Sequence, residues 1–314
     1  MNGFDKKVFA VIVTWNGAAW ISEAILSLQK SSVSIDIVII DNASTDETAA
    51  IVRKAFQNVL LISLNENLGF AQANNTGIQH ALAHGADYVL LLNQDAKVQA
   101  DTVGRLIEAS KQHPDFGILS PMHLTYNGGE IEPAFFAFIK DHRLFATAIL
   151  LGRAQDVYET EFINAAVWLL PRQTLEEVGG LDPVFFMYSE DNDYCYRTRV
   201  HGLKIGFVPR AFAYHQMGSM DIPAMSFKKQ YQKLSSQLIY LLKRPDHIFI
   251  FSCAGLLLSW TKRMIVQAMD FDMKGFSASA LSLFMVSLRI VKVYRHYLHC
   301  KRRGRIWLET DNSM

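Results

Sequence analysis

Two polar stretches of this 314-residue chain hold the residue types that could do chemistry. The first consists of Asn93, Gln94 and Asp95, which directly follow an apolar run at residues 88–92. Such a run predicts a strand buried on both faces, and the ligands of open α/β sheets bind at the carboxyl ends of strands. A carboxylate held there suits a divalent cation that binds a diphosphate, although an ordinary polar turn gives the same pattern.

The second stretch carries three carboxylates within four positions, Glu190, Asp191 and Asp193. Carboxylates packed this densely repel one another unless they are solvated or have a functional role that requires them. A carboxylate at a helix N-terminus can act as a general base that takes the proton of an attacking hydroxyl group. The alternative is a solvated helix start, in which the acidic residues only complement the helix dipole.

The elements that must position these residues alternate along the first 117 residues. The predicted strands are residues 8–14, 35–40, 59–63 and 88–92, and the predicted helices are residues 19–29, 47–56, 72–84 and 101–112. Ser44 or Asp46 is expected to cap the second of these helices. The alternation predicts an α/β fold, with a mainly parallel sheet flanked by helices. Neither G-x-G-x-x-G nor a P-loop motif occurs, so the usual dinucleotide fold and the P-loop fold are not supported.

The pattern changes after residue 118. The sequence predicts an apolar, loop-like insertion at 118–153, a strand at 162–170, a helix at 194–201 opened by the acidic cluster, and a strand at 204–208. From about residue 227 the chain is predicted to be helical. The apolar run at residues 248–260 is shorter than the roughly 20 residues that span a bilayer, and Lys262 and Arg263 interrupt it. A transmembrane helix is therefore not expected.

Composition restricts the compartment and the partners. The net charge is +1, which gives no argument for a nucleic-acid partner. Cys195, Cys253 and Cys300 are scattered and form no metal-ligand spacing, so we expect a reducing compartment and no disulfide framework. The N-terminus lacks the apolar core of a signal peptide, which favours the cytoplasm. Between Lys274 and Arg305 there are eight Lys or Arg residues and no acidic residue.

Six segments, in order, carry a resemblance to a known family. They are residues 11–16 (VIVTWN), 39–46 (IIDNASTD), 65–75 (NENLGFAQANN), 91–95 (LLNQD), 179–182 (GGLD) and 186–193 (FMYSEDND), followed by His215, Gly218 and Ser219. Together they resemble the inverting family 2 glycosyltransferases with the GT-A (Rossmann-like) fold. Within that family, the chain is most similar to the rhamnosyltransferase-type enzymes of bacterial surface-polysaccharide assembly. The resemblance covers roughly residues 8–220.

The resemblance implies a metal site and a catalytic base. Asp95 would bind Mn²⁺ or Mg²⁺ together with the donor diphosphate, but Asn93 replaces the first carboxylate of the family's D-x-D motif and leaves one charge where two are usual. His215 could add a nitrogen ligand, or it could be a structural histidine. Asp191 would be the base. The acidic residues beside it, Glu190 and Asp193, would orient the acceptor or anchor Arg197.

The resemblance also implies contacts to the nucleotide sugar. Asp41 would accept a hydrogen bond from the N3–H of uracil or thymine, because an acceptor-only group suits that imide; its alternative is an Asx turn. Thr14 and Asn16 could equally form a helix cap, and Gly69 could serve only to supply a positive φ. The full set of expected donor contacts is Thr14, Asn16, Asp41, Asn42, Asn67, Gly69, Asn74, Asn93, Gln94 and Asp95.

The hypothesis is an inverting transferase that moves a sugar, specifically L-rhamnose from dTDP-rhamnose, to a polyprenyl-diphosphate-linked saccharide or an oligosaccharide. Residues 1–226 would form the GT-A catalytic domain, with a nucleotide-sugar half at about 1–117 and an acceptor half at about 118–226. The alternatives are a UDP-hexose-dependent enzyme of the same fold, a nucleotidyltransferase and a non-catalytic nucleotide-sugar-binding protein. A nucleotidyltransferase would want a basic glycine-rich loop, and residues 14–18 contain no Lys or Arg.

The helical region at residues 227–314 has two interpretations. Apolar helices followed by basic residues would lie in the membrane interface and attract anionic lipid. Alternatively, the helices pack on the catalytic domain or form a homodimer. We favour the membrane interface, with the protein peripheral on the inner face of the cell membrane, because a lipid-linked acceptor would be met there.

Overall fold

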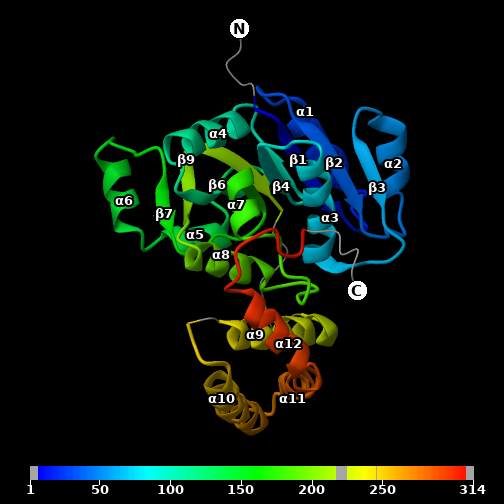
Figure 1. The fold of residues 1–314 in the computed structure, drawn as a ribbon, viewed down its shortest axis with the longest axis vertical. Helices are drawn as coiled ribbons and strands as arrows, with labels where there is room; N and C mark the ends of the chain where they lie inside the picture. The colour runs from blue at the N-terminus through cyan, green and yellow to red at the C-terminus, as the bar shows by residue number, and fades with distance from the viewer. Residues whose placement is uncertain (1–5, 217–224, 245, 309–314) are drawn as a thin grey trace.

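The computed structural model describes residues 6–216, 225–244 and 246–308, so Gly218 and Ser219 of the sequence motif lie outside the described residues. In this part of the chain, nine strands form one sheet in the order β3-β2-β1-β4-β8-β6-β9-β5, and β7 pairs with β9 (Figure 1). The strands are β1 (Val8–Thr14), β2 (Asp36–Asp41), β3 (Leu60–Ser63), β4 (Tyr88–Leu92), β5 (Ala96–Val98), β6 (Phe116–Thr125), β7 (Tyr158–Thr160), β8 (Val167–Pro171) and β9 (Lys204–His215).

Helices cover both faces of the sheet, and four more form a separate layer beneath it (Figure 1). The helices of the upper part, which we call the body, are α1 (Ile21–Gln29), α2 (Thr48–Ala55), α3 (Gly69–Ala83), α4 (Thr102–Gln112), α5 (Pro133–Ile139), α6 (Arg143–Leu150), α7 (Arg172–Glu177) and α8 (Glu190–Val200). The lower layer, which we call the tail, contains α9 (Phe227–Lys243), α10 (Phe249–Met269), α11 (Met273–Leu288) and α12 (Ile290–His299).

The predicted mainly parallel sheet flanked by helices is confirmed. Strands β3, β2, β1 and β4 pair in parallel, and both of their faces are covered. Along β1, Ile12 packs into the hydrophobic core on one face and Val11 into the core on the other. Continuous apolar strands are what burial on both faces requires. This arrangement brings the carboxyl ends of β1, β2 and β4 to one edge of the sheet.

The other half of the sheet differs from the sequence prediction. Residues 118–153 are not a loop-like insertion, because β6 pairs with both β8 and β9 and helices α5 and α6 follow it. Strand β9 also continues past Val208 to His215. Both errors come from prolines: the register between these strands shifts after Pro121 and Val208, and Pro209 follows in the irregular segment. A proline inside a strand is tolerated at such an irregularity but hides the strand in the sequence.

The prediction that the tail lacks a helix of membrane-spanning length is wrong. Helix α10 does not end at residue 260 but continues through Lys262 and Arg263, which are good helix formers, to Met269. Among the described helices, α10 alone is long and apolar enough to cross a membrane, with 21 residues and only 6% of its apolar window buried. The pair α11 and α12 would also qualify if it counted as one span, although it is bent by 71°.

A buried charge network joins the tail to the body. Lys243 of α9 lies between two carboxylates, pairing with Asp182 and with Asp193 at 2.6 Å. Asp193 also accepts from Arg197 Nε at 2.8 Å, and Asp182 Oδ1 lies 2.5 Å from His296 Nδ1 of α12. Asp182, Asp193, Arg197 and Lys243 are all buried. Loss of one partner from such a network leaves an uncompensated buried charge, which is strongly destabilising.

The chain after α12 then returns to the body. We call residues 303–308 the docking segment. The backbone N–H of Gly180 donates to Ile306 at 2.9 Å, and Arg305 forms a 2.7 Å ion pair with Glu176 of α7. The ring of Trp307 lies 4.8 Å from the guanidinium of Arg197. Part of the basic C-terminal run is therefore used in contacts with the body.

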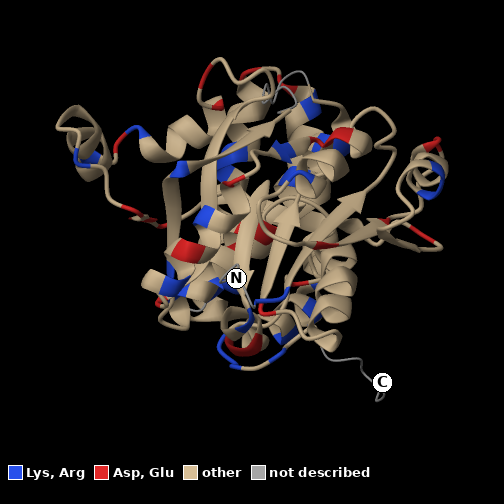
Figure 2. Cartoon of the chain, turned by 90° about the horizontal axis from the view of Figure 1, so that it is seen from above, with Lys and Arg blue, Asp and Glu red and all other residues tan. Residues whose placement is uncertain are grey.

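Charge is otherwise well mixed on the protein. In the view of Figure 2, residues of both signs are scattered over the body, and several Lys and Arg residues lie together at the lower edge. This mixed distribution agrees with the net charge of +1.

Candidate active site

Two cavities meet at the segment that leads into α8. The smaller one, about 210 Å³, lies at the carboxyl ends of β1, β2 and β4, and we call it the strand-end pocket. The larger one, about 910 Å³, lies between the body and helices α9 to α11, and we call it the interface cavity. Met187 lines the strand-end pocket and Tyr188 lines the interface cavity. A ligand in one cavity would therefore be separated from a ligand in the other by a short length of backbone.

The strand-end pocket is lined by residues in or next to five connections of the chain: those that follow β1, β2, β3 and β4, and the one that leads into α8. They are Val13, Trp15, Asn42, Asn67, Gly69, Phe70, Asn93, Gln94, Asp95 and Met187. Gln94 ties two of these loops together, since its Oε1 accepts from Thr14 Oγ1 at 2.6 Å and from the N–H of Trp15 at 3.0 Å. A Cβ on Gly17 would come within 2.1 Å of this same oxygen, so a larger residue there would displace the Gln94 side chain.

Asn42 organises the loop on the other side of the pocket. Its Oδ1 accepts from the N–H of Leu68 at 2.8 Å, and its Nδ2 donates to Asn67 Oδ1 at 3.0 Å. Gly69 has φ +79°, and a Cβ there would lie 2.2 Å from the carbonyl oxygen of Phe186. Glycine is thus required by both conformation and close approach. The contact brings the start of α3 against the segment that enters the acidic cluster.

Four of the residues predicted to contact the donor do not line this pocket: Thr14, Asn16, Asp41 and Asn74. Asn16 Oδ1 accepts from the N–H of Thr45 at 2.8 Å and so joins two loops. Asp41 is buried, and its Oδ1 accepts from the N–H of Ser44 at 3.1 Å, which is the Asx-turn alternative. Asn74 donates to Phe70 within α3. In the structure these residues support the loops around the pocket.

Asp95 and His215, the predicted metal ligands, lie side by side. His215 Nε2 is 3.5 Å from Asp95 Oδ1 and 3.4 Å from Asn93 Nδ2. The pairing of β5 with β9 brings them together, because it places Ala96 opposite His215. On the other side of the ring, His215 Nδ1 lies 2.7 Å from Glu132 Oε1. Glu132 is completely buried and also contacts His123.

The charges of this group support one another. Burial alone would disfavour the charged form of each group, but the contacts with Asp95 and Glu132 outweigh it and raise the pKa of His215 to about 9. For Glu132, the contacts with His123 and His215 likewise outweigh burial and lower its pKa to about 2. Glu132 is therefore an ionised carboxylate that holds the His215 ring in place.

The residues present fit a divalent cation that is shared with a ligand. A carboxylate that holds one ring nitrogen of a histidine leaves the other nitrogen to bind a metal ion in place of its proton, and Glu132 holds Nδ1 while Nε2 faces Asp95. Among the described residues, no group of three or more His, Cys, Asp or Glu side chains could hold a metal ion. Two protein ligands suit an ion that takes its remaining ligands from phosphates and water.

The acidic cluster follows a strained turn. Tyr188 and Ser189 have φ values of +70° and +66°, a left-handed conformation that costs non-glycine residues about 1–3 kcal/mol each. The turn starts α8 so that Glu190 and Asp191 line the interface cavity. Asp193 does not line the cavity but pairs with the buried cations Lys243 and Arg197. The cluster thus divides into two cavity-lining carboxylates and one structural carboxylate.

The two cavity-lining carboxylates have raised pKa values. Burial is the main cause for Glu190, and the charges of Asp191 and Asp193 add to it, so that its pKa rises to about 8. Among the described residues, its buried Oε2 has no hydrogen-bond partner. Burial also raises the pKa of Asp191, against hydrogen bonds from the backbone and side chain of Asn192 to its Oδ1 at 2.8 and 3.0 Å. A carboxylate with a raised pKa is a stronger base.

Several residues of the two cavities were not predicted from the sequence. Glu132 lies in the segment that was expected to be an apolar loop, and its partner His215 is 83 positions away. The tail side of the interface cavity is formed by helices α9 to α11, which the sequence motifs do not reach. In the sequence, these residues are visible only as single charged residues among apolar ones. Such a residue alone does not show which distant residue it contacts in the fold.

Comparison with known proteins gives a family. The profile described as Glycosyl transferase family 2 matches residues 9–166, just over half of the chain. The dTDP-rhamnosyl transferase RfbF of Shigella flexneri is 23% identical over 251 residues, covering 78% of this chain and 82% of that protein. An N-acetylglucosaminyl-diphospho-decaprenol L-rhamnosyltransferase of Mycobacterium tuberculosis is 25% identical over 229 residues, covering 65% of this chain and 74% of that protein.

Solved structures show the same fold at low identity. The mannosyltransferase PcManGT from Pyrobaculum calidifontis, in complex with GDP-Man and Mn²⁺, aligns with a TM-score of 0.58 at 18% identity and covers 95% of this chain and 86% of that one. GalNAc-T7 with UDP, GalNAc and Mn²⁺ aligns with a TM-score of 0.58 at 16% identity, over 76% of this chain and 48% of that one. The GT-A fold expected from the sequence is confirmed.

Proposed function

This chain belongs to glycosyl transferase family 2 and is a nucleotide-sugar glycosyltransferase, and from that premise we propose that it transfers L-rhamnose from dTDP-rhamnose to a lipid-linked saccharide in cell-surface polysaccharide synthesis. Two similar proteins support this choice by name: one is a dTDP-rhamnosyl transferase, and the other is a rhamnosyltransferase whose name includes a diphospho-decaprenol acceptor. The observation that carries the proposal is the meeting of the strand-end pocket and the interface cavity at Met187 and Tyr188. One pocket would hold the donor and the other the acceptor.

The strand-end pocket would bind the donor nucleotide. Its rim offers amide groups of Asn42, Asn67 and Gln94, and Asp41 lies at the carboxyl end of β2 next to Asn42. A carboxylate accepts more than one hydrogen bond, so Asp41 would accept the N3–H of thymine or uracil in addition to the bond from Ser44. The same imide is present in both bases. A UDP-hexose is therefore the alternative donor.

Asp95 and His215 would hold Mn²⁺ or Mg²⁺ together with the donor diphosphate. When bound, the ion would supply positive charge that stabilises the departing diphosphate. Glu132 would keep the His215 ring oriented for this role. Asn93 would contribute a neutral amide where a second carboxylate is common, so binding of the ion would depend on the diphosphate.

Asp191 would act as the catalytic base. The acceptor hydroxyl oxygen would attack the anomeric carbon, the bond from that carbon to the diphosphate oxygen would break, and Asp191 would take the hydroxyl proton. Attack from the side opposite the diphosphate inverts the anomeric carbon. Glu190, with a pKa of about 8, would remain protonated at neutral pH and so spare Asp191 a charged neighbour. Asp193 would anchor Arg197 and Lys243 and thereby hold α8 in place.

We further propose that the tail lies on the cytoplasmic face of the membrane. Large apolar side chains of α10 and α11 are exposed, among them Phe251, Leu258, Phe284 and Leu288. Exposed apolar faces of this extent are typical of membrane or protein interfaces. A homodimer is the alternative occupant of these faces. Two measurements separate the alternatives. A membrane-binding tail predicts that the protein floats with anionic vesicles, whereas a dimer interface predicts no flotation and a mass in solution that depends on protein concentration.

The test of the proposed function is calorimetry with dTDP, UDP, GDP and ADP, each with and without Mn²⁺. Binding of dTDP or UDP only in the presence of Mn²⁺ is the expected result, and transfer from dTDP-rhamnose would then be assayed by product analysis. Binding of a purine nucleotide alone would contradict the roles of Asp41 and Asn42. Transfer from a UDP-hexose, with no transfer from dTDP-rhamnose, would replace rhamnose by that sugar.

A further inference from the structure

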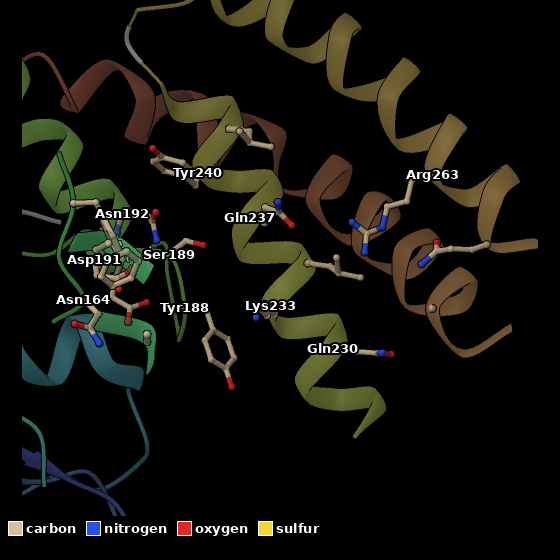
Figure 3. A pocket seen from close by; sticks show the side chains of 18 of the residues that line it. Asn164, Tyr188, Ser189, Asp191, Asn192, Gln230, Lys233, Gln237, Tyr240 and Arg263 are labelled. Carbon is tan, nitrogen blue, oxygen red and sulfur yellow. Dashed lines mark hydrogen bonds between the residues drawn. The ribbon is translucent and has the colours of Figure 1, made fainter. Parts of the chain in front are cut away.

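The interface cavity carries carboxyl groups on its body side and cations on its tail side. The body side presents Glu190 and Asp191 from the start of α8, and the tail side presents Lys233 from α9 and Arg263 from α10. Figure 3 shows Asp191 on one side of the cavity, with Lys233 and Arg263 on the helices opposite. The proposed role of Asp191 accounts for the acidic side. Nothing in that role requires cations on the other side.

Lys233 and Arg263 form no ion pair with another described residue. In the part of the chain that the structure describes, no carboxylate lies within 4.0 Å of the charged groups of Lys233 or Arg263. Arg263 lies over the ring of Trp260, at 5.3 Å from its centroid. Asp272, the nearby acidic residue of the lining, is engaged in capping α11, where it accepts from the N–H of Gly275 at 2.9 Å. Two cations facing one cavity favour a bound anion.

The remaining lining suits a saccharide. Amide side chains can donate and accept hydrogen bonds with hydroxyl groups, and aromatic rings offer apolar faces to sugar rings. The cavity volume of about 910 Å³ falls within the range of about 300–1,000 Å³ that ligand sites occupy. The lining residues of these two kinds include Asn164, Gln237, Gln267, Phe162, Tyr188 and Tyr240.

The tail side of the cavity adjoins a strongly apolar turn. Three residues at this turn line the cavity: Asp272 belongs to the connection between α10 and α11, and Lys274 and Gly275 belong to the first turn of α11. Phe271 of the connection is 88% exposed, and Met269, the last residue of α10, is 73% exposed. An anion held by Lys233 and Arg263 would therefore lie next to a surface suited to a lipid chain.

We propose that Lys233 and Arg263 bind the diphosphate of a lipid-linked saccharide acceptor, whose sugar extends toward Asp191 and whose lipid leaves along the turn between α10 and α11. This inference rests on the proposed function, since it names the acceptor class of the same site. Charge-assisted bonds to phosphate are among the stronger hydrogen bonds in proteins, and arginine can make two in parallel. The acceptor would thus be recognised at both ends, by cations at the diphosphate and by a base at the hydroxyl group.

The experiment measures binding of farnesyl diphosphate to the full chain in the presence of EDTA, so that the strand-end pocket, which needs a metal ion for a diphosphate, does not compete. The test variant is Lys233→Gln with Arg263→Gln. The matched control is Lys228→Gln with Lys262→Gln, which removes the same charge from exposed positions of the same two helices outside the cavity. We expect at least a tenfold weaker affinity in the test variant and less than a twofold change in the control.

Two further ligands distinguish the source of the phosphate. Farnesol should bind weakly and be insensitive to the test variant, and inorganic pyrophosphate should bind more weakly than farnesyl diphosphate. Equal affinities for pyrophosphate and farnesyl diphosphate would overturn the lipid-linked assignment. An unchanged affinity in the test variant, or equal losses in the test and control variants, would overturn the site itself. The single variant Arg263→Gln, at an exposed position, repeats the test if the double variant does not fold.

Failure of this inference is separable from failure of the proposed function. The same proteins are titrated with dTDP and UDP in the presence of Mn²⁺. If wild type binds neither nucleotide, the proposed function fails. If the nucleotide binds normally in all variants while farnesyl diphosphate binding is indifferent to Lys233 and Arg263, only the diphosphate site fails.

Discussion

The strand-end pocket and the interface cavity are built in different ways. Every residue that lines the strand-end pocket belongs to the body, and most of them follow the ends of β1, β2 and β4 or begin α3. The interface cavity draws its lining from segments between Ala134 and Gly275, and its tail side comes from α9, α10 and α11. The first is a property of the sheet, whereas the second exists only while the tail is docked on the body.

This difference assigns separate tasks to separate parts of the chain. A pocket formed by strand ends is rigid, which suits the recognition of a donor and a metal ion. A cavity formed between two layers can change in shape when the helices of one layer change, without any change in the sheet. We therefore expect lesions in the strand-end pocket to affect nucleotide binding, and lesions in the interface cavity to affect transfer alone.

The largest effect should come from Asp191→Asn, which keeps the shape of the side chain but removes the base. Transfer should fall by about 10²–10⁴-fold, the usual contribution of a general base. Nucleotide affinity should stay within a few-fold, because Asp191 lines only the interface cavity. Product formation and calorimetry on the same preparation check both statements. A parallel loss of nucleotide binding would contradict the assignment of nucleotide binding to the strand-end pocket and of transfer to the interface cavity.

Asp95→Asn should produce the complementary pattern. Asp95 is the one carboxylate among the described residues that line the strand-end pocket. Its removal should weaken Mn²⁺-dependent nucleotide binding by at least about 100-fold, because loss of a residue that only orients a metal ligand already costs about 10–100-fold. Binding of farnesyl diphosphate in EDTA should be unaltered. Calorimetry with and without Mn²⁺ measures the effect, and an unchanged affinity would exclude Asp95 as a metal ligand.

Glu132→Gln should have a smaller effect on the same quantity. Glutamine keeps one acceptor for His215 Nδ1 but removes the charge that orients the ring, so Mn²⁺-dependent nucleotide affinity should fall by about tenfold. The matched control is Glu130→Gln, an exposed residue two positions away, which should behave as wild type. Circular dichroism confirms that the variants are folded. If Glu130→Gln lowers the affinity as much as Glu132→Gln does, the orienting role is wrong.

The smallest effect should be on stability, and it concerns Glu190. Its pKa is about 8 in the folded protein against an ordinary value of 4.5, so between these values the folded state holds a proton that the unfolded state has lost. Stability therefore falls as the pH rises from about 4.5 to 8. Glu190→Gln cannot titrate. The difference in melting temperature, Glu190→Gln minus wild type, should therefore increase by a few degrees as the pH rises from about 4.5 to 8.

Melting curves at pH 5.0, 6.5 and 8.5 measure the difference. The exposed Glu108→Gln in α4 serves as the control and should run parallel to wild type at all three values. A difference between Glu190→Gln and wild type that does not change with pH would show that Glu190 titrates near its ordinary pKa. In that case the interface cavity would carry two charged carboxylates at neutral pH.

The half of the fold that could be predicted is the half with local signals. Each strand between Val8 and Leu92 is largely an apolar run; a turn and a helix follow β1, β2 and β3, and the short strand β5 precedes the helix after β4. The ends of these runs also identified most of the strand-end pocket, because the carboxyl ends of neighbouring parallel strands lie together. Strands β6 and β9 were missed or cut short because Pro121 and Pro209 interrupt their patterns.

The rest of the site depends on partners that are distant in the sequence. Lys243 meets Asp193 across 50 positions, and Glu132 meets His215 across 83. No periodicity or motif records such a pairing, since it is enforced by the cost of leaving a buried charge unpaired in the folded protein. The sequence prediction that Glu190 or Asp193 anchors Arg197 nevertheless contains the correct member, Asp193.

Because the docking segment and the tail are synthesised after the body, the two cavities are completed at different times during translation. At synthesis rates of about 5–20 residues per second, Asp193 precedes its partner Lys243 by roughly 3–10 s and the last described residue, Leu308, by roughly 6–23 s. During that interval the carboxylates of Asp182 and Asp193 have no tail cations and must stay hydrated. The nascent chain can therefore complete the strand-end pocket first, and it completes the interface cavity only after the tail has been synthesised and has packed against α7 and α8.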